Sequence, residues 1–529
     1  MAKDYDVVFI GAGHNGLTAA GYLAKAGLSV CLLERASFAG GAVNTREVTL
    51  PGFRHDTGSV GHVMIQSNPL LLDDELGLKS KFGLEYIYVD VATAAIYPDG
   101  SALYVHHDVD RTCESIAQFS QHDAEAYRRF YDMAKPMGPL LTQGTFSPPV
   151  SFGSLLTQLE GSEVGRNLER IFFMSAQDLV DEWFEDERIK VHLLKYSTEQ
   201  MSYYDATGSA LALFFGVPMH HGYGTGTPKG GSGGLADALV RCVKAYGGEV
   251  RLDCEVVGVQ VSGGRATGVT LASGETVRAR RAVICNVDPR PLFNEWVPAE
   301  ATDPEFRRKV NTIKDAPFSG IMQHLALDAA PRYTAGPEAE KAYMIEPTPW
   351  LADFKGVFND LRLGRLPHAS KVPLWVCNSQ HDPSRAPAGK HVVYLWQYVP
   401  YRPDGRDPQA WDSIKEEYAD EVLEFMRGYV TNLTPEMILA RAVHSPYDYP
   451  RMNPNLVNGS VTGPRNDLLQ YFSNRPIHEL GQFRTPIESL YLVRHAPRTP
   501  LTRHASGVRG ACRNARKEGG PSCGRCSPP

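Results

Sequence analysis

The start of the chain constrains its fold most, because a short apolar run leads directly into a glycine-rich turn. Residues 6–10 form this run, and Gly11, Gly13 and Gly16 follow it. Gly11 permits a tight turn, Gly13 lets a pyrophosphate approach the backbone, and Gly16 lets the next helix pack against the strand. A helical pattern at residues 17–24 then presents free N–H groups and a positive dipole end to the phosphates. The segment predicts a dinucleotide site.

The residues after the second apolar run indicate which dinucleotide is bound. Glu34 lies about twenty residues past the glycines, where a carboxylate accepts hydrogen bonds from a ribose diol. Arg35 and the pair Gly40-Gly41 follow it. A simple NAD dehydrogenase needs no glycine pair here, whereas in one large group of flavoproteins an Arg and a Gly-Gly bring the backbone close to the FAD phosphates. An ordinary turn is the alternative interpretation of the pair. We favour FAD over NAD.

A second block, residues 228–290, has the pattern of an αβ unit with a small antiparallel sheet. It opens with a glycine-rich turn, and Gly247-Gly248 end its helical pattern. Strand patterns follow, the last of them ending at Asn286. Placed after the N-terminal unit, this block indicates that the chain returns to complete one domain. The predicted fold class is α/β: a Rossmann-type FAD-binding domain, as in flavoproteins with two dinucleotide-binding domains, with an inserted α+β substrate domain.

A chain of 529 residues is too long for one simple core, so we expect interleaved domains. The expected parts are FAD-binding segments at 1–67, 228–290 and 451–493, a helical substrate segment at 68–227, a mixed-sheet substrate segment at 291–450, and an atypical basic tail at 494–529.

The chain resembles the phytoene desaturase family of FAD-dependent oxidoreductases, including its carotene ketolase and retinol saturase-like branches. The residues that carry the resemblance are Gly11–Leu17, Glu34–Gly41, Pro228–Leu235, Gly247–Val256, Asp382–His391 and Arg484–Leu492. The resemblance implies a flavin that takes hydride from an unactivated or allylic C–H of a lipophilic substrate in a dry pocket. Positioning supplies much of such catalysis, so no dedicated nucleophile or metal is required. We assign no catalytic residue and expect no metal site.

The motif and the resemblance together give a set of expected cofactor-binding residues, in which Val256 contacts the adenine through its backbone. The set is Gly11, Gly13, His14, Asn15, Gly16, Glu34, Arg35, Gly40, Gly41, Ala42, Val256, Asn286, Gly507 and Val508.

The substrate region allows two interpretations of its apolar residues. Helical patterns occur at 124–133 and 175–196, and an apolar run occupies 210–219. Several aromatic residues either line an apolar tunnel or pack against a sheet as strand residues, and the sequence does not decide between these roles. They are Trp350, Phe354, Trp375, Tyr394, Trp396 and Tyr398. His55 and Asp56 follow the second glycine pair and are either proton-relay groups or structural residues.

The C-terminal segment departs from the family pattern. In the family, a glycine-rich turn and a helix facing the flavin follow the strand that Leu490–Leu492 matches. Here residues 494–529 carry seven Arg, one Lys and one Glu, and only the stretch around Gly507 and Val508 resembles the expected turn. Three interpretations stay open: a basic tail attracted to anionic lipid, a diverged flavin loop, or an altered reading frame.

Composition limits the partners and the compartment. The net charge of −6 gives no basic surface for nucleic acid, and no apolar run approaches the ~18 residues of a membrane span. The start resembles no cleaved signal, and the cysteines outside the tail are scattered, so we expect a cytoplasmic protein. The expected partners are a small hydrophobic substrate and oxygen or a quinone as electron acceptor. The resemblance also implies peripheral association with a membrane.

Three functions follow. The favoured one is an FAD-dependent desaturase or ketolase acting on an isoprenoid- or carotenoid-like substrate. The second is an FAD-dependent amine or alcohol oxidase acting on a smaller substrate. The third is a flavin-poor pseudoenzyme that results from the altered C-terminal motif.

Overall fold

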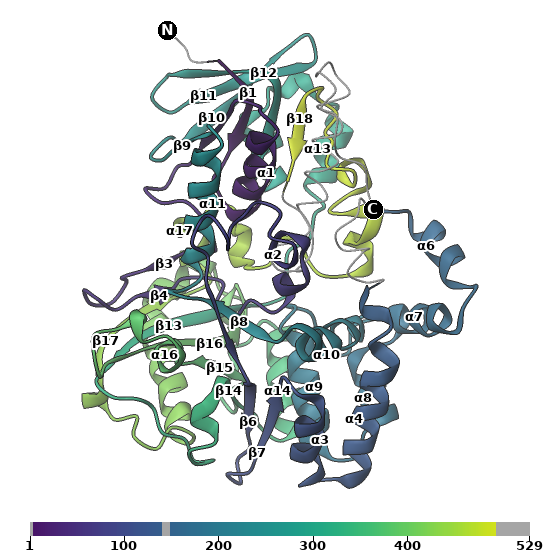
Figure 1. Cartoon of the computed structure of the whole chain (residues 1–529), viewed down its shortest axis with the longest axis vertical. Coiled ribbons are helices and arrows are strands. Elements are labelled where there is room, and N and C mark those ends of the chain that lie inside the picture. The colour runs from purple at the N-terminus through teal and green to yellow at the C-terminus, as the bar shows by residue number, and fades with distance from the viewer. Residues whose placement is uncertain (1–3, 140–148, 494–529) are drawn as a thin grey trace.

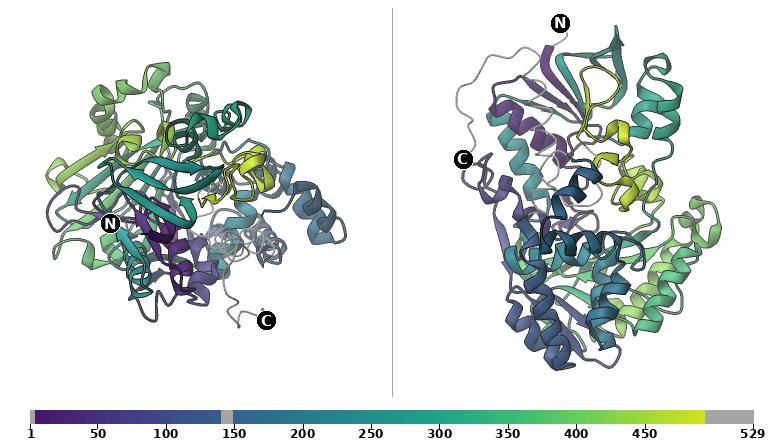
Figure 2. Two further views of the ribbon diagram at one scale, coloured as in Figure 1. Left: turned by 90° about the horizontal axis from the view of Figure 1, so that it is seen from above. Right: turned by 90° about the vertical axis from the view of Figure 1, so that its right-hand side faces the viewer.

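The computed structural model describes residues 4–139 and 149–493, which form two lobes, each built around a β-sheet (Figure 1). The N-terminal strand lies in the upper lobe of this view. The lower lobe holds the second sheet, and helices gather on one side of it. Among these, α6 and α7 project furthest from the body (Figures 1 and 2).

The upper sheet has, among the described residues, seven strands in the order β10-β11-β12-β1-β2-β9, with β18 also pairing with β12. Its central strand β1 is parallel to both β2 and β12, while β10, β11 and β12 form an antiparallel meander. The bounds are β1 Asp4–Ile10, β2 Val30–Leu33, β9 Glu249–Arg251, β10 Val256–Ser262, β11 Arg265–Leu271, β12 Thr276–Cys285 and β18 Leu490–Leu492.

Both faces of β1 are covered, because its apolar residues alternate between two cores. Val7 and Phe9 pack with helices α1 (His14–Lys25) and α11 (Gly233–Ala245). Val8 packs with the meander on the opposite face. This double coverage explains why residues 7–10 of β1 are continuously apolar, and the turn that follows them lies at the carboxyl edge of the sheet.

The lower sheet has, within the same described ranges, the strand order β17-β13-β16-β15-β14-β6-β7. Its strand β16 alternates strictly: Leu395 packs with helix α16 on one face, and Tyr394 and Trp396 face the helical side. The bounds are β6 Val91–Ile96, β7 Ala102–His106, β13 Ser319–Leu327, β14 Ala342–Pro347, β15 Pro373–Val376, β16 His391–Val399, β17 Ile438–His444 and α16 Trp411–Arg427.

The helical side contains one difference from the sequence-based expectation. The pattern at 175–196 forms two helices instead of one, because Phe184 is extended and Asp186 caps a new helix. The buried Asp123 carboxylate accepts the Glu185 and Asp186 N–H groups at 2.9 and 2.8 Å, which fixes the break. The helix bounds are α3 Val109–Ala117, α4 Gln121–Ala134, α6 Phe152–Leu159, α7 Glu163–Phe173, α8 Ala176–Trp183, α9 Glu187–Thr198, α10 Leu211–Tyr223 and α14 Leu351–Arg362.

Short elements connect the lobes. Two-stranded sheets pair β3 with β4 and β5 with β8. The bounds are β3 Thr45–Arg46, β4 His55–Asp56, β5 Tyr86–Val89, β8 Thr225–Pro228, α2 Pro69–Leu72, α12 Pro289–Pro291, α13 Pro304–Val310, α15 Asn378–His381 and α17 Asp448–Met452.

The hydrophobic cores of the upper lobe include residues outside the expected segments 1–67 and 228–290. Leu70 and Leu76 lie beyond residue 67 but are buried in the same core as α1 and α11. Phe293 and Phe306 lie beyond residue 290 but pack against the meander of the upper sheet. These flanking segments therefore belong to the cofactor lobe, because the faces of its sheet are buried by residues that follow the strand patterns in sequence.

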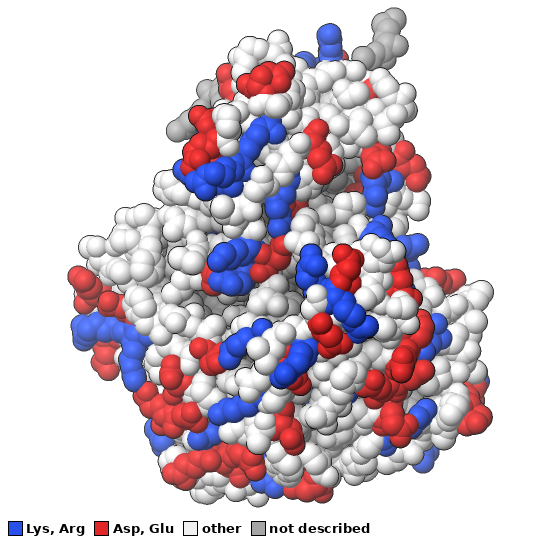
Figure 3. Space-filling view, turned by 180° about the vertical axis from the view of Figure 1, so that it is seen from behind, with Lys and Arg blue, Asp and Glu red and all other residues white. Residues whose placement is uncertain are grey.

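The surface carries no dominant charge on the face shown in Figure 3, where acidic and basic side chains are interspersed. None of the helices in residues 4–139 and 149–493 is long and apolar enough to cross a bilayer. Over the same residues, no group of three or more His, Cys, Asp or Glu side chains is arranged to hold a metal ion.

Candidate functional site

The glycine turn after β1 is closed against a second strand end. Gly11 has φ +87°, a conformation that glycine adopts without strain. A Cβ on Gly13 would lie 2.5 Å from Asn286 Nδ2, and one on Gly16 would lie 2.8 Å from the Gly11 carbonyl oxygen. Asn286 follows β12 and is held there because its N–H donates to the Ile10 carbonyl oxygen at 2.9 Å. The turn thus requires glycine at these positions for steric reasons.

The second glycine pair packs directly on the first turn. The Gly40 N–H donates to the Ala12 carbonyl oxygen at 2.9 Å, and the Gly40 carbonyl oxygen accepts the His14 N–H at 3.3 Å. A Cβ on Gly41 would approach Gly13 Cα to 3.3 Å. The two loops therefore form one surface made mostly of backbone. A side chain at Gly40 would in addition meet backbone at 2.3 Å, and its φ of +112° disfavours other residues.

The expected ribose acid is fixed beside this surface. The two carboxylate oxygens of Glu34 accept the Ala12 and Ala36 N–H groups at 2.8 and 2.9 Å. Each ionised carboxylate oxygen has a second lone pair, so capacity for a diol remains. The Glu34 carbonyl oxygen accepts the Cys254 N–H at 2.7 Å, which brings the segment leading to Val256 alongside Glu34.

The expected cofactor residues occupy different positions in the structure. Gly11, Gly16 and Gly40 shape the turn, Glu34 and Val256 lie alongside one another at its flank, and Arg35 is exposed. Gly507 and Val508 lie outside the described residues. The remaining residues line a cavity: Gly13, His14, Asn15, Gly41, Ala42 and Asn286.

The edge of this cavity suits the pyrophosphate of a dinucleotide. Helix α1 starts at Gly13 without a side-chain cap and has no acidic residue in its first turn. The buried Asn15 Oδ1 has no hydrogen-bond partner in the described part of the chain. Phosphate is bound by backbone N–H groups at the positive end of a helix, and no carboxylate in the first turn of α1 would repel it.

The cavity has a volume of about 1030 Å³ and extends from the glycine turns into the helical side of the lower lobe. Pockets for drug-sized ligands span about 300–1,000 Å³, so this space suits a cofactor end together with a substrate. Its distal walls are largely apolar. They include Met64, Leu168, Phe172, Leu211, Phe215, Met322, Tyr394, Trp396 and Tyr398.

For Tyr394, Trp396 and Tyr398 both sequence-based interpretations hold, because these residues of β16 also line the cavity. Trp350, Phe354 and Trp375 are not among the residues that line it. The rings of Tyr394 and Trp396 are stacked at 6.5 Å, and Trp396 is also stacked on Tyr449 at 6.1 Å. Gly320 on the neighbouring strand permits this layer, because a Cβ there would lie 2.1 Å from the Trp396 ring. The roles coexist because alternate residues of a strand face opposite sides.

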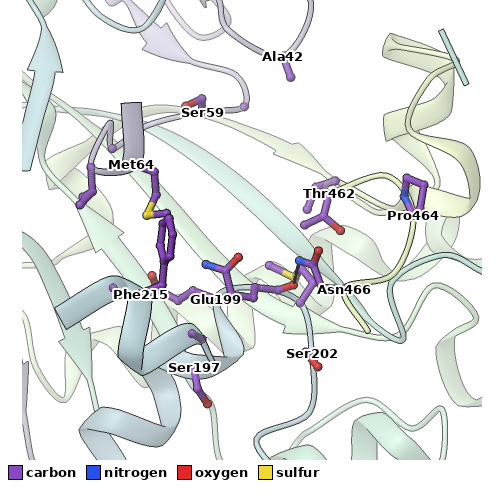
Figure 4. Close-up of a pocket in the computed structure, with 18 of the residues that line it drawn as sticks. Ala42, Ser59, Met64, Ser197, Glu199, Ser202, Phe215, Thr462, Pro464 and Asn466 are labelled. Carbon is purple, nitrogen blue, oxygen red and sulfur yellow. Dashed lines mark hydrogen bonds between the residues drawn. The ribbon is translucent and has the colours of Figure 1, made fainter. Parts of the chain in front are cut away.

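Sequence reasoning missed several polar residues of the cavity. Glu199, Asn466 and Ser202 lie on the wall drawn in Figure 4, and Ala42 and Ser59 lie opposite them. The available signal for Glu199 was a carboxylate three residues past the end of the predicted helical pattern at 175–196. That signal is also common for exposed residues, so it did not distinguish this position.

His55 and Asp56 occupy structural positions. Asp56 is fully buried and forms an ion pair with Arg385 at 3.1 Å. The His55 ring forms a hydrogen bond with Thr49 Oγ1 at 2.8 Å, and burial, aided by the Arg385 charge, lowers its pKa to about 3. Neither residue lines the cavity, so the geometry favours the structural interpretation over the proton relay.

A backbone cradle at the carboxyl edge of parallel strands, next to a largely apolar cavity, defines a dinucleotide-binding protein of the two-lobed flavoprotein class. The chain belongs to the flavin-containing amine oxidoreductase family, whose profile matches residues 16–453. It has the α/β fold of FAD-dependent amine oxidases. Cyclohexylamine oxidase from Brevibacterium oxydans, at 14% identity, superposes with a TM-score of 0.58 over 98% of this chain and 100% of that chain.

The relatives in sequence include enzymes of terpenoid metabolism. Pyridine nucleotide-disulfide oxidoreductase domain-containing protein 2 of Mus musculus is 30% identical, with 93% of this chain and 90% of that protein covered. A limonene dehydrogenase component from Castellaniella defragrans is 28% identical with the same coverage. A lycopene-forming phytoene desaturase from Paracoccus is 26% identical, with 84% of each chain covered. The resemblance to the phytoene desaturase family is thereby confirmed.

Proposed function

We propose that this protein is an FAD-dependent oxidoreductase that removes hydride from a C–H bond of a hydrophobic, isoprenoid-like substrate, as a desaturase or ketolase. The observation that carries the proposal is the cavity shared by the glycine turns and the apolar walls of α7, α10 and β16. One end of the cavity suits a pyrophosphate and the other end suits a hydrocarbon, so a cofactor and a substrate can meet in the same cavity. The relatives named for limonene and phytoene support the same substrate class.

The residues of this chain have distinct roles in that reaction. Gly13 and Gly41 let the cofactor phosphates approach the backbone, and Glu34 is placed for the ribose. When bound, the flavin supplies the two-electron acceptor. The apolar walls exclude water and hold the substrate carbon in position, which is where much of the rate enhancement of such a reaction arises.

The alternative proposal is an amine or alcohol oxidase acting on a smaller substrate. The stacked layer of Tyr394, Trp396 and Tyr449 favours it, because aromatic faces attract a cationic amine. The length of the apolar wall formed by α7 and α10 favours the first proposal. As electron acceptor we propose oxygen or a quinone, and as location the cytoplasm with peripheral membrane association.

The test is the visible spectrum of the purified protein, followed by anaerobic addition of limonene, detergent-dispersed phytoene, geraniol and cyclohexylamine in separate samples. Oxidised-flavin bands that are bleached by limonene or phytoene support the proposal. Bleaching by geraniol or cyclohexylamine alone supports the alternative. A colourless protein that takes up no added FAD contradicts both and favours the pseudoenzyme.

A further inference from the structure

A chain of buried ionisable groups connects the lower sheet with the cavity. Lys195 of α9 and Glu346 of β14 are each only 1% exposed, and Lys195 Nζ lies 2.6 Å from Glu346 Oε1. On the other side of this carboxylate, His192 Nδ1 lies 3.4 Å from Glu346 Oε2. Charged groups in a protein core are retained only when they are paired, so these contacts form a defined cluster.

Two members of the cluster, His192 and Glu199, line the cavity, and the more exposed of the two is Glu199. Its carboxylate Oε1 lies 3.4 Å from Lys195 Nζ, and its side chain is 26% exposed and lines the cavity. Figure 4 shows it in the middle of the wall that faces Ala42 and Ser59, which lie on the cofactor side. The same cavity contains Gly13 and Gly41 of the phosphate cradle. A substrate bound in this space therefore has access to Glu199.

One lysine, Lys195, contacts both carboxylates of the cluster. Glu199 also caps the C-terminal end of α9, where the helix dipole disfavours a negative charge. Burial and the nearby Glu346, only partly offset by Lys195, raise the pKa of Glu199 to about 7. Burial opposes ionisation of Glu346 as well, but Lys195 and His192 outweigh it and lower its pKa to about 2. Glu199 thus exchanges a proton near neutral pH.

Three other titratable groups next to Glu199 do not compete for this proton. Burial raises the pKa of Tyr398, on β16, to about 12, and it raises the pKa of Tyr196, on α9, above its ordinary value. Burial lowers the pKa of Lys195, but Glu346 and Glu199 more than compensate, so the net shift is upward. These three groups stay protonated in the pH range where Glu199 titrates.

We propose that Glu199 is the proton acceptor for substrate oxidation in this cavity, a catalytic residue that Lys195 positions. This assignment rests on the proposed function. In the dehydrogenation of a hydrocarbon, one C–H bond breaks with its electron pair, which passes to oxidised flavin as hydride. The adjacent C–H bond loses a proton to the Glu199 carboxylate, and the electrons of that bond form the new C=C bond. The substrate is oxidised by two electrons and the flavin is reduced by two.

The first experiment compares anaerobic flavin reduction in the wild type, Glu199→Gln, Glu199→Asp and the control Glu417→Gln. Glu417 is an exposed carboxylate on α16 whose replacement makes the same change in charge. The probe is whichever of limonene, phytoene, geraniol or cyclohexylamine bleaches the wild-type flavin. We expect the wild-type rate to rise with pH to a plateau above about 7, as befits a base with the pKa of Glu199. Glu199→Gln is expected to be slower by about 100-fold or more and to lose this pH dependence.

A second measurement does not depend on turnover. Because the folded-state pKa of Glu199 is raised, the native protein binds more protons than the unfolded chain between the ordinary carboxyl pKa and about 7. The melting temperature of the wild type should therefore fall, relative to Glu199→Gln, as the pH rises through this window, and the difference should level off above it. Glu199→Asp keeps the carboxylate and should retain both the pH-dependent rate and the titration.

The outcomes separate the two proposals. Flavin that is reduced equally fast in the wild type and in Glu199→Gln, with the same pH profile, overturns the role of Glu199 and leaves the proposed function intact. Flavin that none of the probes reduces overturns the proposed function and this assignment with it. If Glu199→Gln does not fold, a Glu199→Asp enzyme without a pH-dependent rate also overturns the assignment.

Discussion

The buried ion pair of Asp56 and Arg385 yields the sharpest prediction about stability. Asp56 Oδ1 accepts the Thr45 hydroxyl at 2.6 Å and the Ser232 N–H at 2.9 Å. Its Oδ2 lies 3.1 Å from Arg385 and accepts the Asn378 side-chain amide at 3.2 Å. One carboxylate therefore joins β3, the turn before α11 and two segments next to the lower sheet.

Asp56→Asn removes the charge and leaves the Arg385 guanidinium, which is 1% exposed, without its counter-ion. Removing one partner of a buried pair costs about 3–5 kcal/mol of stability. The new amide group also points a donor toward groups that donate, so at least one of the four contacts is lost. We expect the free energy of unfolding to fall by about 4 kcal/mol by the same principle.

The assay is urea unfolding followed by circular dichroism. Asp328→Asn serves as the control, because Asp328 forms an exposed pair with Lys390 and its loss should cost under about 1 kcal/mol. The double variant Asp56→Asn/Arg385→Met removes the stranded charge and should recover part of the loss. If Asp56→Asn were as stable as Asp328→Asn, the assignment of Asp56 to a structural role would be refuted.

Three further predictions follow from local geometry. Gly40→Ala should abolish FAD retention, measured by the flavin absorbance of the purified protein, because its Cβ would lie 2.3 Å from a backbone oxygen. The control Gly247→Ala, which has a positive φ but open space around it, should retain FAD. Equal retention of FAD by the two variants would contradict the role of Gly40 in the phosphate cradle. Burial and the charge of His14 lower the pKa of His62 to about 3, so its contribution to stability is complete above the ordinary histidine pKa and is lost as the pH falls toward 3. His62→Gln should therefore make the free energy of unfolding less dependent on pH between these limits. An unchanged dependence on pH would contradict this prediction. Gly320→Ala should lower stability by about 1–3 kcal/mol and alter tryptophan fluorescence, because its Cβ would overlap the Trp396 ring; an unchanged urea midpoint would contradict this packing.

The sequence predicted the cofactor lobe well because its signals are local. A strand, a turn and a helix that are adjacent in sequence must also be adjacent in space, so the glycine positions specify the turn after β1 directly. The strand at Leu490–Leu492 was also expected, from the resemblance, and in the structure it is β18, which pairs with β12. The boundaries at 67 and 290 stay predictions, since they depend on which distant segments bury the faces of the sheet.

For the substrate-binding side of the cavity, the sequence predicted only the types of residue and not the direction in which their side chains face. Tyr394 and Trp396 were recognised as aromatic residues of a strand or a tunnel, but strand register decided that they face the cavity. The one predicted helix at 175–196 became two, because Asp123, more than fifty residues earlier, accepts the N–H groups at the break. Local periodicity contains no information about such a partner.

The sequence by itself determined the dinucleotide turn, because the space around Gly11, Gly13 and Gly16 depends on neighbours within a few residues and on one predictable strand. Only the tertiary structure decided what the cavity can do. Lys195 and Glu199 are one helical turn apart, but Glu346, the other carboxylate that Lys195 contacts, lies about 150 residues away on β14. The energy of a charge depends on its burial and on its neighbours in space, and folding alone brings these together.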